Sequence, residues 1–207
     1  MFLEPQFHRS PRETHTGWIE VICGSMFSGK TEELIRRVKR AIIAKQKVKI
    51  VKPILDTRYH QTNVVSHNSN YIEAIPVEHS KEILSIAKGS EVIGIDEAQF
   101  FDNHLTEICI ELANQGKRVI VSGLDMDFEG NPFGQMPYLM SIAEFVTKLH
   151  AICARCGNIA SYSFRLSAAK EKVLLGEKNE YEPRCRRCFL EGMQQRKELE
   201  SRQLNIF

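Results

Sequence analysis

One short segment constrains the fold of this chain more than any other. Residues 24–31 read Gly-Ser-Met-Phe-Ser-Gly-Lys-Thr, a complete G-x-x-x-x-G-K-[ST] phosphate loop. An apolar run at residues 18–23 precedes it and a helical pattern at residues 32–46 follows it, which is the context that the motif requires. Glycines let backbone N–H groups turn towards phosphate oxygens, and the helix N-terminus adds partial positive charge. In this motif Lys30 reaches the β and γ phosphates and Thr31 offers a hydroxyl to Mg²⁺.

We therefore expect ATP with Mg²⁺ as the ligand of this loop. The residues expected to contact ATP are Gly24, Ser25, Met26, Phe27, Ser28, Gly29, Lys30 and Thr31.

Short β-branched runs alternate with helical patterns along the chain. Strands are expected at residues 18–23, 47–52, 91–96 and 117–122. Weaker strand patterns occur at residues 71–77 and 147–153. Helices are expected at residues 32–46, 78–88 and 101–115. This alternation predicts an α/β fold, with a parallel sheet covered by helices on both faces. The order of the strands does not follow from it.

Composition is typical of a compact enzyme with one core. The chain has 207 residues, of which 43% are hydrophobic, and a formal net charge of +2. That charge disfavours a protein whose main task is to grip a nucleic-acid backbone. The first residues lack the pattern of a signal peptide, and no stretch approaches about 18 apolar residues, so we expect a cytoplasmic protein without a membrane partner. Residues 1–16 are polar and are expected to form a flexible tail.

A pair of carboxylates follows the apolar strand at residues 91–96. Ligands of open α/β sheets bind beyond the carboxyl ends of the strands, so Asp96 is placed to hold Mg²⁺. Glu97 is then free to act as a base on a substrate hydroxyl or on water. Ala98 and Gln99 complete the expected ATP-binding set with these two residues. The alternative is a surface acidic pair that favours the start of a helix.

Four cysteines form two knuckles, Cys153-x-x-Cys156 and Cys185-x-x-Cys188. Two such pairs predict a closed, structural Cys₄ zinc site. A disulfide pair is disfavoured in a reducing compartment, and a redox C-x-x-C is disfavoured because neither pair opens a helix in a thioredoxin-like unit. The 28 residues between the knuckles exceed the roughly 15 to 20 of a plain zinc ribbon. From the residues alone, a lid over a ligand and a mobile β-hairpin are equal alternatives.

Taken together, residues 18–192 closely resemble the cytosolic, zinc-containing type II thymidine kinases of bacteria and animals. The resemblance is carried by residues 24–31, 52–59 with Asp56-Thr57-Arg58, 95–101 and 123–134, and by both cysteine pairs. It implies ATP-dependent phosphorylation of the thymidine 5′-hydroxyl, a homotetramer, feedback inhibition by thymidine triphosphate, and a "lasso" loop between the knuckles that closes over the nucleoside. The long C-terminal tail of animal members is missing, which favours a bacterial-type member.

The resemblance also implies roles for individual residues. Glu97 would be the general base. The nucleoside would be surrounded by Met26, Phe100, Leu124, Phe128, Phe133 and Tyr181, and its base would be read by the lasso residues Ser163, Lys172, Val173, Leu174, Leu175 and Gly176. The chain departs from the family's usual residues at Ser163, Lys172 and Leu174.

Three of these candidates have a structural alternative. Arg58 is the candidate for further charge neutralisation beside the phosphates, and a surface salt bridge with Asp56 is the alternative. Phe128 and Phe133 lie in a loop that contains Gly and Pro, where aromatic side chains either wall a base pocket or anchor the loop. Both Asp56 and Arg58 are included in the expected substrate site.

The expected organisation is an N-terminal tail (1–16), a phosphate-loop α/β kinase domain (17–150), a zinc-ribbon and lasso domain (151–192) and a C-terminal tail (193–207). The alternative function is an ATPase that acts on nucleic acid, with Glu97 activating water. The short chain and nearly balanced charge disfavour it. A binding module with a degenerate nucleotide site is excluded because Lys30, Thr31, Asp96 and Glu97 are all present. A pocket with room for a 5-methyl group is expected to accept deoxyuridine less well than thymidine.

Overall fold

The computed structural model describes residues 16–54, 63–65, 71–167 and 180–204, which form two compact units. The α/β unit consists of the described parts of Met1–Cys23, Lys30–Asp125 and Phe133–Lys148. The zinc-ribbon unit consists of the described parts of Gly24–Gly29, Met126–Pro132 and Leu149–Phe207. It therefore includes two short segments that precede the expected boundary at residue 151. All but the last residue of the expected N-terminal tail lies outside the described residues.

A six-stranded sheet forms the centre of the α/β unit, in the order β5-β2-β6-β7-β1-β8. Its strands are β1 (Trp18–Gly24), β2 (Val48–Pro53), β5 (Ile75–Val77), β6 (Val92–Ile95), β7 (Arg118–Gly123) and β8 (Phe145–Leu149). The pairs β2–β5, β2–β6, β6–β7 and β1–β7 are parallel. The weak strand pattern at residues 71–77 is in fact two strands, because β4 (Tyr71–Glu73) pairs with β3 (Asn63–Val65) in a separate antiparallel ribbon.

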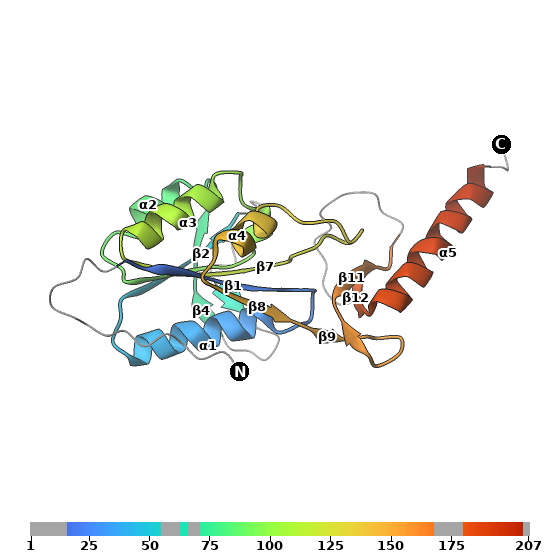
Figure 1. Ribbon diagram of the computed structural model, residues 1–207, viewed down its shortest axis with the longest axis horizontal. Helices are drawn as coiled ribbons and strands as arrows, with labels where there is room; N and C mark the ends of the chain where they lie inside the picture. The colour runs from blue at the N-terminus through green and yellow to red at the C-terminus, as the bar shows by residue number, and fades with distance from the viewer. Residues whose placement is uncertain (1–15, 55–62, 66–70, 168–179, 205–207) are drawn as a thin grey trace. The chain divides into compact units, whose positions relative to one another are not determined.

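Helices cover both faces of this sheet, with α1 on one side and α2, α3 and α4 on the other (Figure 1). Their bounds are Lys30–Ile43 for α1, Glu82–Ile86 for α2, Leu105–Asn114 for α3 and Met136–Ile142 for α4, and a 3₁₀ turn, η1, spans Ala98–Phe100. The predicted fold class is thus confirmed. Helix α4 was not expected, since its seven residues include Pro137 and are too few for a clear periodic pattern.

Close packing and a buried charge cluster fix α1 on the sheet. Leu34 and Val38 of α1 pack over Gly94 of β6, where a Cβ would lie 3.5 Å from each of these side chains, at ordinary van der Waals contact. Beneath the helix, Arg37 donates to the fully buried carboxylate of Glu20 on β1 at 2.8 Å, and Arg118 of β7 donates to it at 2.6 Å. Breaking a buried pair of this kind leaves an uncompensated charge, so the cluster holds α1 in register with two strands.

The zinc-ribbon unit is built from two antiparallel pairs and one helix. Strands β9 (Ala151–Ile152) and β10 (Ile159–Ala160) pair with each other, as do β11 (Tyr162–Arg165) and β12 (Tyr181–Arg184). Helix α5 (Arg186–Leu204) follows β12 and continues across residue 193, where the sequence suggested a boundary. Within the described residues, no helix combines the length and the hydrophobicity needed to cross a membrane.

Candidate active site

The phosphate loop joins β1 to α1, and its backbone has the conformation that glycines permit. Gly24 and Gly29 have positive φ angles of 145° and 85°, and Phe27 between them also has a positive φ of 63°. A Cβ at Gly24 would lie 2.3 Å from the carbonyl oxygen of Leu149, so no side chain fits there. The hydroxyl of Ser28 is buried and has no hydrogen-bond partner among the described residues. Such a loop suits a ligand that brings its own acceptors, as a phosphate does.

Two residues of the loop are anchored within the zinc-ribbon unit. The N–H of Met26 donates to the hydroxyl of Ser163 on β11 at 2.9 Å. Phe27 packs against a buried cluster that includes Cys153 and Cys185. Met26 and Ser163, both predicted to contact the nucleoside, are therefore in direct contact with each other. The loop conformation depends in part on the zinc-ribbon unit.

Strand register brings polar residues together at the carboxyl edge of the sheet. Ile95 of β6 pairs with Val51 of β2 on one side and with Val121 of β7 on the other. The residues that follow Val51, Ile95 and Val121 in the chain therefore lie in one row across the three strands. They are Lys52, Asp96 and Ser122. The N–H of Asp96 donates to the carbonyl of Val51 at 3.0 Å, which extends this pairing.

The electrostatics of this edge match a site for a phosphate and a cation. Burial and the neighbouring carboxylate of Glu97 raise the pKa of Asp96 to about 7, although Ser122 and Lys30 act in the opposite direction. Burial lowers the pKa of Lys30, while Glu97 and Asp96 oppose that shift. Burial lowers the pKa of Lys52 as well, against the same two carboxylates. The two carboxylates and Lys30 thus lie in one partly desolvated environment, which an Mg²⁺ ion and phosphate oxygens would complete.

Glu97 has a backbone conformation that is rare for its residue type. Its φ and ψ angles are 52° and 40°, in the left-handed region. A non-glycine residue there costs on the order of 1 kcal/mol or more and tends to occur at functional sites. The carboxylate of Glu97 accepts a hydrogen bond of 2.5 Å from the side-chain amide of Gln99, which in turn accepts one of 2.8 Å from the N–H of Leu124.

The structure adds two charged residues that sequence reasoning did not assign. Lys52 neighbours Asp96 and Glu97, as described above. Asp125, only 6% exposed, forms an ion pair of 2.6 Å with Lys148 and acts on Lys30 electrostatically. Lys52 is the penultimate residue of β2 and Asp125 follows β7, so the rule that ligands bind at the carboxyl ends of strands could have found both residues.

The other predicted nucleoside contacts fall into two sets. In the α/β unit, Phe100 and Phe133 pack edge to face with ring centroids 5.5 Å apart. In the zinc-ribbon unit, the rings of Phe128 and Tyr181 lie near the fully buried guanidinium of Arg165, at 3.7 and 5.2 Å. Arg165 also donates to the Tyr181 hydroxyl, with the shorter bond at 2.6 Å. Sequence reasoning did not single out Arg165, since a lone arginine in a strand carries no pattern.

Several predicted site residues lie outside the described residues. They are Asp56, Arg58, Lys172, Val173, Leu174, Leu175 and Gly176. Their roles stay predictions.

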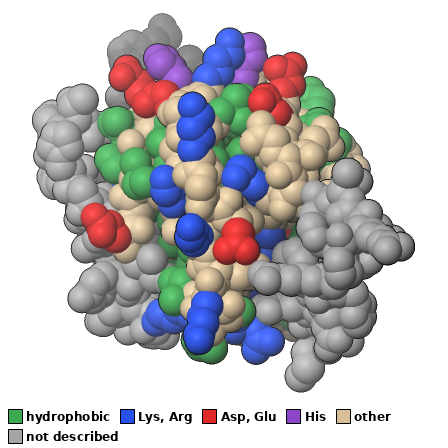
Figure 2. Space-filling model, turned by 90° about the vertical axis from the view of Figure 1, so that its left-hand side faces the viewer, with side chains coloured by type: hydrophobic (Ala, Val, Ile, Leu, Met, Phe, Trp, Pro, Cys, Tyr) green, Lys and Arg blue, Asp and Glu red, His purple; other side chains and the backbone are tan. Residues whose placement is uncertain are grey.

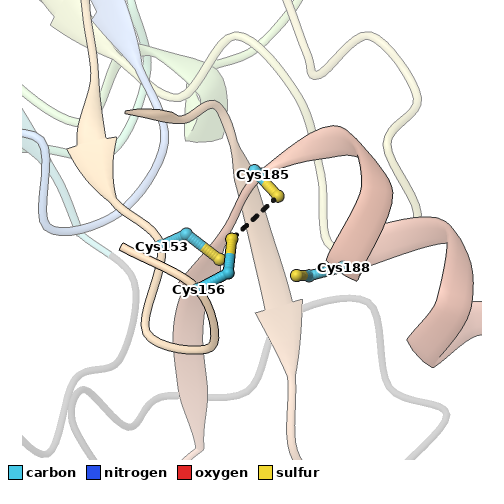
Figure 3. Close-up of side chains that lie close together, drawn as sticks. All are labelled: Cys153, Cys156, Cys185 and Cys188. Atoms are coloured by element: carbon cyan, nitrogen blue, oxygen red, sulfur yellow. Dashed lines mark hydrogen bonds between the residues drawn. The ribbon is translucent and has the colours of Figure 1, made fainter. Parts of the chain in front are cut away.

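The four predicted zinc ligands converge at the base of the zinc-ribbon unit (Figure 3). Cys153 follows β9, Cys156 lies in the turn before β10, Cys185 follows β12, and Cys188 lies in the first turn of α5. Their sulfur atoms all lie within 4.8 Å of one another, and those of Cys156 and Cys185 are 3.6 Å apart. Tetrahedral zinc with Zn–S bonds of about 2.3 Å separates its sulfurs by about 3.8 Å, so the four thiols fit this ion.

Two of the four thiols have a lowered pKa, which favours the form that binds a metal. Burial raises the pKa of Cys153, but hydrogen bonds from the backbone of Cys185, Arg155 and Cys156 outweigh it and bring the value to about 6. Hydrogen bonding, first from the backbone of Asn158, also lowers the pKa of Cys156. Thiolate is the form that binds zinc. Burial and the neighbouring thiols raise the pKa of Cys188 to about 12. Burial alone raises the pKa of Cys109, a core thiol outside this cluster, to about 12 as well.

A phosphate loop, a strand-end carboxylate pair and a parallel sheet define a phosphate-loop nucleotide-binding protein of the α/β class. A model of the thymidine kinase family matches residues 17–189. A thymidine kinase of Rhodothermus sp. (strain ITI 518) is 58% identical over 84% of this chain and 81% of its own length. Those of Bacteroides thetaiotaomicron and Porphyromonas gingivalis are 59% and 58% identical over 84% of this chain, and over 87% and 85% of their own lengths. The chain belongs to the thymidine kinase family.

Proposed function

We infer that this protein is a thymidine kinase that transfers the terminal phosphoryl group of ATP to the 5′-hydroxyl of thymidine. The observation that carries this conclusion is the family match over residues 17–189, within which the phosphate loop and the Asp96–Glu97 pair are complete. The nucleic-acid ATPase alternative is not favoured by the relatives. On the face shown in Figure 2, Lys and Arg side chains run down the middle, and acidic side chains lie beside them, chiefly towards the top.

Phosphoryl transfer requires positioning and charge neutralisation more than covalent help from the protein. In the proposed mechanism, the N–H groups of the phosphate loop and the Lys30 ammonium bind the phosphates of ATP. The Thr31 hydroxyl and the Asp96 carboxylate would hold Mg²⁺, which supplies further neutralisation of the phosphate charge when it is bound. Lys52 is close enough to both carboxylates to balance their charge when no metal is present.

Glu97 is the proposed general base. It accepts the proton of the 5′-hydroxyl while that oxygen attacks the γ phosphorus and ADP leaves with the electrons of the broken P–O bond. Its location directly after Asp96 supports this role, because the acceptor hydroxyl must lie beside the phosphate group that the Asp96 site would help to bind. Its strained backbone and its hydrogen bond with Gln99 support it further.

The nucleoside contacts are proposed from the resemblance and supported by local geometry. Phe100, Leu124 and Phe133 would offer apolar surface to the base, as would Met26, Phe128 and Tyr181. Ser163 and the lasso residues 172–176 would read its polar edge. Arg58 would neutralise charge beside the phosphates. A homotetramer and feedback inhibition by thymidine triphosphate complete the proposal, together with a cytoplasmic location, which suits a protein with six free thiols.

An assay of ATP consumption with each nucleoside in turn, and then with single-stranded DNA, tests this function. Thymidine should be converted to its 5′-monophosphate, deoxyuridine should be used less well, and purine nucleosides should scarcely be used. One buried methyl group is worth only about 1 kcal/mol, whereas a steric clash is worth far more. Use of deoxycytidine as good as that of thymidine, or stimulation by DNA alone, would contradict the assignment.

A further inference from the structure

Gln99 is almost fully buried, at 3% exposed, and it lies two residues after Glu97 in η1. Its side-chain amide bridges two parts of the active-site edge. The carbonyl oxygen accepts a hydrogen bond of 2.8 Å from the N–H of Leu124, and the amide nitrogen donates one of 2.5 Å to the carboxylate of Glu97. Both partners belong to the same compact unit as Gln99.

The orientation of this amide is determined by its partners. A backbone N–H can only donate, so it requires the amide oxygen. A carboxylate accepts hydrogen bonds, so it requires the amide nitrogen. A flipped amide would lose both bonds, and the bridge therefore has one arrangement.

Close backbone packing holds Gln99 itself in place. A Cβ at Gly134 would lie 2.3 Å from the carbonyl oxygen of Gln99, and a Cβ at Gly123 would lie 2.8 Å from its side-chain oxygen. Glycine at these two positions lets the backbone approach Gln99 from two sides. The amide consequently has little room to move, whereas Glu97 is only partly buried and begins η1 from a left-handed conformation. The rigid amide is thus suited to orient the more exposed carboxylate.

We propose that Gln99 is a positioning residue. Its side-chain amide orients the Glu97 carboxylate towards the acceptor hydroxyl and links that carboxylate to the backbone N–H of Leu124. This inference rests on the proposed function, in which Glu97 is the base and Leu124 contacts the nucleoside. It gives Gln99 a role beyond the ATP contact expected from its place in the motif. A carboxylate on a short strained turn would otherwise sample several directions, and a misplacement of about 1 Å can cost on the order of 100-fold in rate.

The experiment compares wild type, Gln99→Leu, Glu97→Gln and the double variant in single-turnover and steady-state assays with thymidine and ATP. Gln99→Leu keeps the approximate shape but removes both hydrogen bonds. We expect kcat to fall by about 10- to 100-fold, as for loss of a hydrogen bond to a charged group, with the KM for ATP changed by less than about threefold. In the Glu97→Gln background the same change should cost less than about twofold, because residues that act as one unit are not additive.

A matched control is Gln115→Leu. The Gln115 amide also donates to a glutamate carboxylate, that of Glu111 at 3.1 Å, but at the exposed end of α3. This variant should retain wild-type kcat. If Gln99→Leu fails to fold by thermal melting, Gln99→Glu provides a second test, since it keeps an acceptor for Leu124 and replaces the donor to Glu97 with an oxygen. It should show a comparable loss of kcat.

Unchanged kcat in Gln99→Leu, or a full additional loss in the double variant, would overturn the positioning role. Absence of thymidine turnover in the wild type would instead contradict the proposed function, so the two failures are distinguishable.

Discussion

The two units are stabilised internally by different means. In the α/β unit, one cluster among the described residues contains twenty buried hydrophobic side chains from the sheet, η1 and helices α2, α3 and α4 and their flanking residues, and α1 buries further apolar residues outside it, among them Leu34 and Val38. The described residues of the zinc-ribbon unit form two much smaller clusters. One contains five residues, three of them cysteines of the candidate zinc site, and the other contains Tyr162, Phe164 and Phe189.

Cationic side chains supplement these small clusters. The guanidinium of Arg184 lies 3.4 Å from the ring centroid of Phe164, and that of Arg165 lies 3.7 Å from that of Phe128. Small units bury too little apolar surface to be stable without a metal or another cross-link. We therefore expect apolar burial to be sufficient for the α/β unit, and the zinc-ribbon unit to depend on a metal held by its four cysteines.

Removal of zinc should have the largest effect, and it should be confined to one unit. The purified protein should contain close to one zinc per chain, and Cys156→Ser or a chelator should release it. Structural zinc contributes an apparent ~10 to 16 kcal/mol in small zinc-binding units, so hydrogen exchange should accelerate across β11, β12 and the first turns of α5 while β6 and β7 stay protected. The KM for ATP should also rise, because Phe27 packs against the cysteine cluster.

Equal loss of protection in both units after chelation would contradict the expectation that only the zinc-ribbon unit depends on a metal. So would native protein that contains no zinc.

A cavity in the large core should show the opposite pattern. Leu112 on α3 is fully buried in the main cluster. Leu112→Ala should lower the free energy of unfolding of the α/β unit by about 2 to 5 kcal/mol, because it removes buried methyl groups and leaves a void. Denaturant titration measures this loss, and metal analysis should show unchanged zinc content. A loss of zinc in this variant would mean that the two units do not unfold separately.

Arg165→Met tests the smaller contributions within the zinc-ribbon unit. The variant keeps an unbranched side chain but loses the contact with Phe128 and the hydrogen bonds to Tyr181. We expect a destabilisation of about 2 kcal/mol from loss of the cation–π contact and the bonds to the hydroxyl. The KM for thymidine should rise more than the KM for ATP, because both rings are proposed nucleoside contacts.

Lys197→Met replaces an exposed cation on α5 and serves as the control. It should change neither the stability of the unit nor the KM for thymidine. If Arg165→Met behaves as this control does, the guanidinium does not organise the aromatic residues.

The last expected effect has the opposite sign, a gain in stability at the active-site edge. In the folded protein the Asp96 carboxyl has a pKa of about 7, raised by burial and by Glu97 from its ordinary value of 3.8. Between about pH 4 and pH 7 the folded state therefore binds more protons at this site than the unfolded state, and this site lowers the free energy of unfolding as pH rises.

Asp96→Asn should remove this pH-dependent cost. Without nucleotide, its melting temperature should exceed that of the wild type above pH 7, and the difference should disappear near pH 4. Activity should be lost, since the amide carries no charge for Mg²⁺. Melting curves from pH 4 to pH 8 measure the effect. A variant less stable than wild type at pH 8 would show that the carboxylate stabilises the nucleotide-free fold.

Much of the fold could be predicted because its signals are local. The phosphate loop and the apolar runs at residues 91–96 and 117–122 depend on near neighbours in the chain, and the structure has β1, β6, β7 and α1 close to the expected positions. Helix α4 and the separation of β4 from β5 were missed. Their residues are too few for periodicity, and their structure depends on partners that are distant in the sequence.

The sequence by itself determined the fold class, the phosphate loop and the cysteine set, because fixed spacing encodes the chemistry of each. It also identified Asp96 and Glu97 as a strand-end pair. Tertiary structure alone decided the strand order, the row formed by Lys52, Asp96 and Ser122, and the ion pair of Asp125 with Lys148.

Tertiary structure likewise decided that the amide of Gln99 bridges Glu97 and Leu124, and that Arg165 lies near the rings of Phe128 and Tyr181. The physical reason is the same in each case. These contacts join residues from different strands and loops, and they depend on register, burial and close backbone approach, which a linear pattern does not encode.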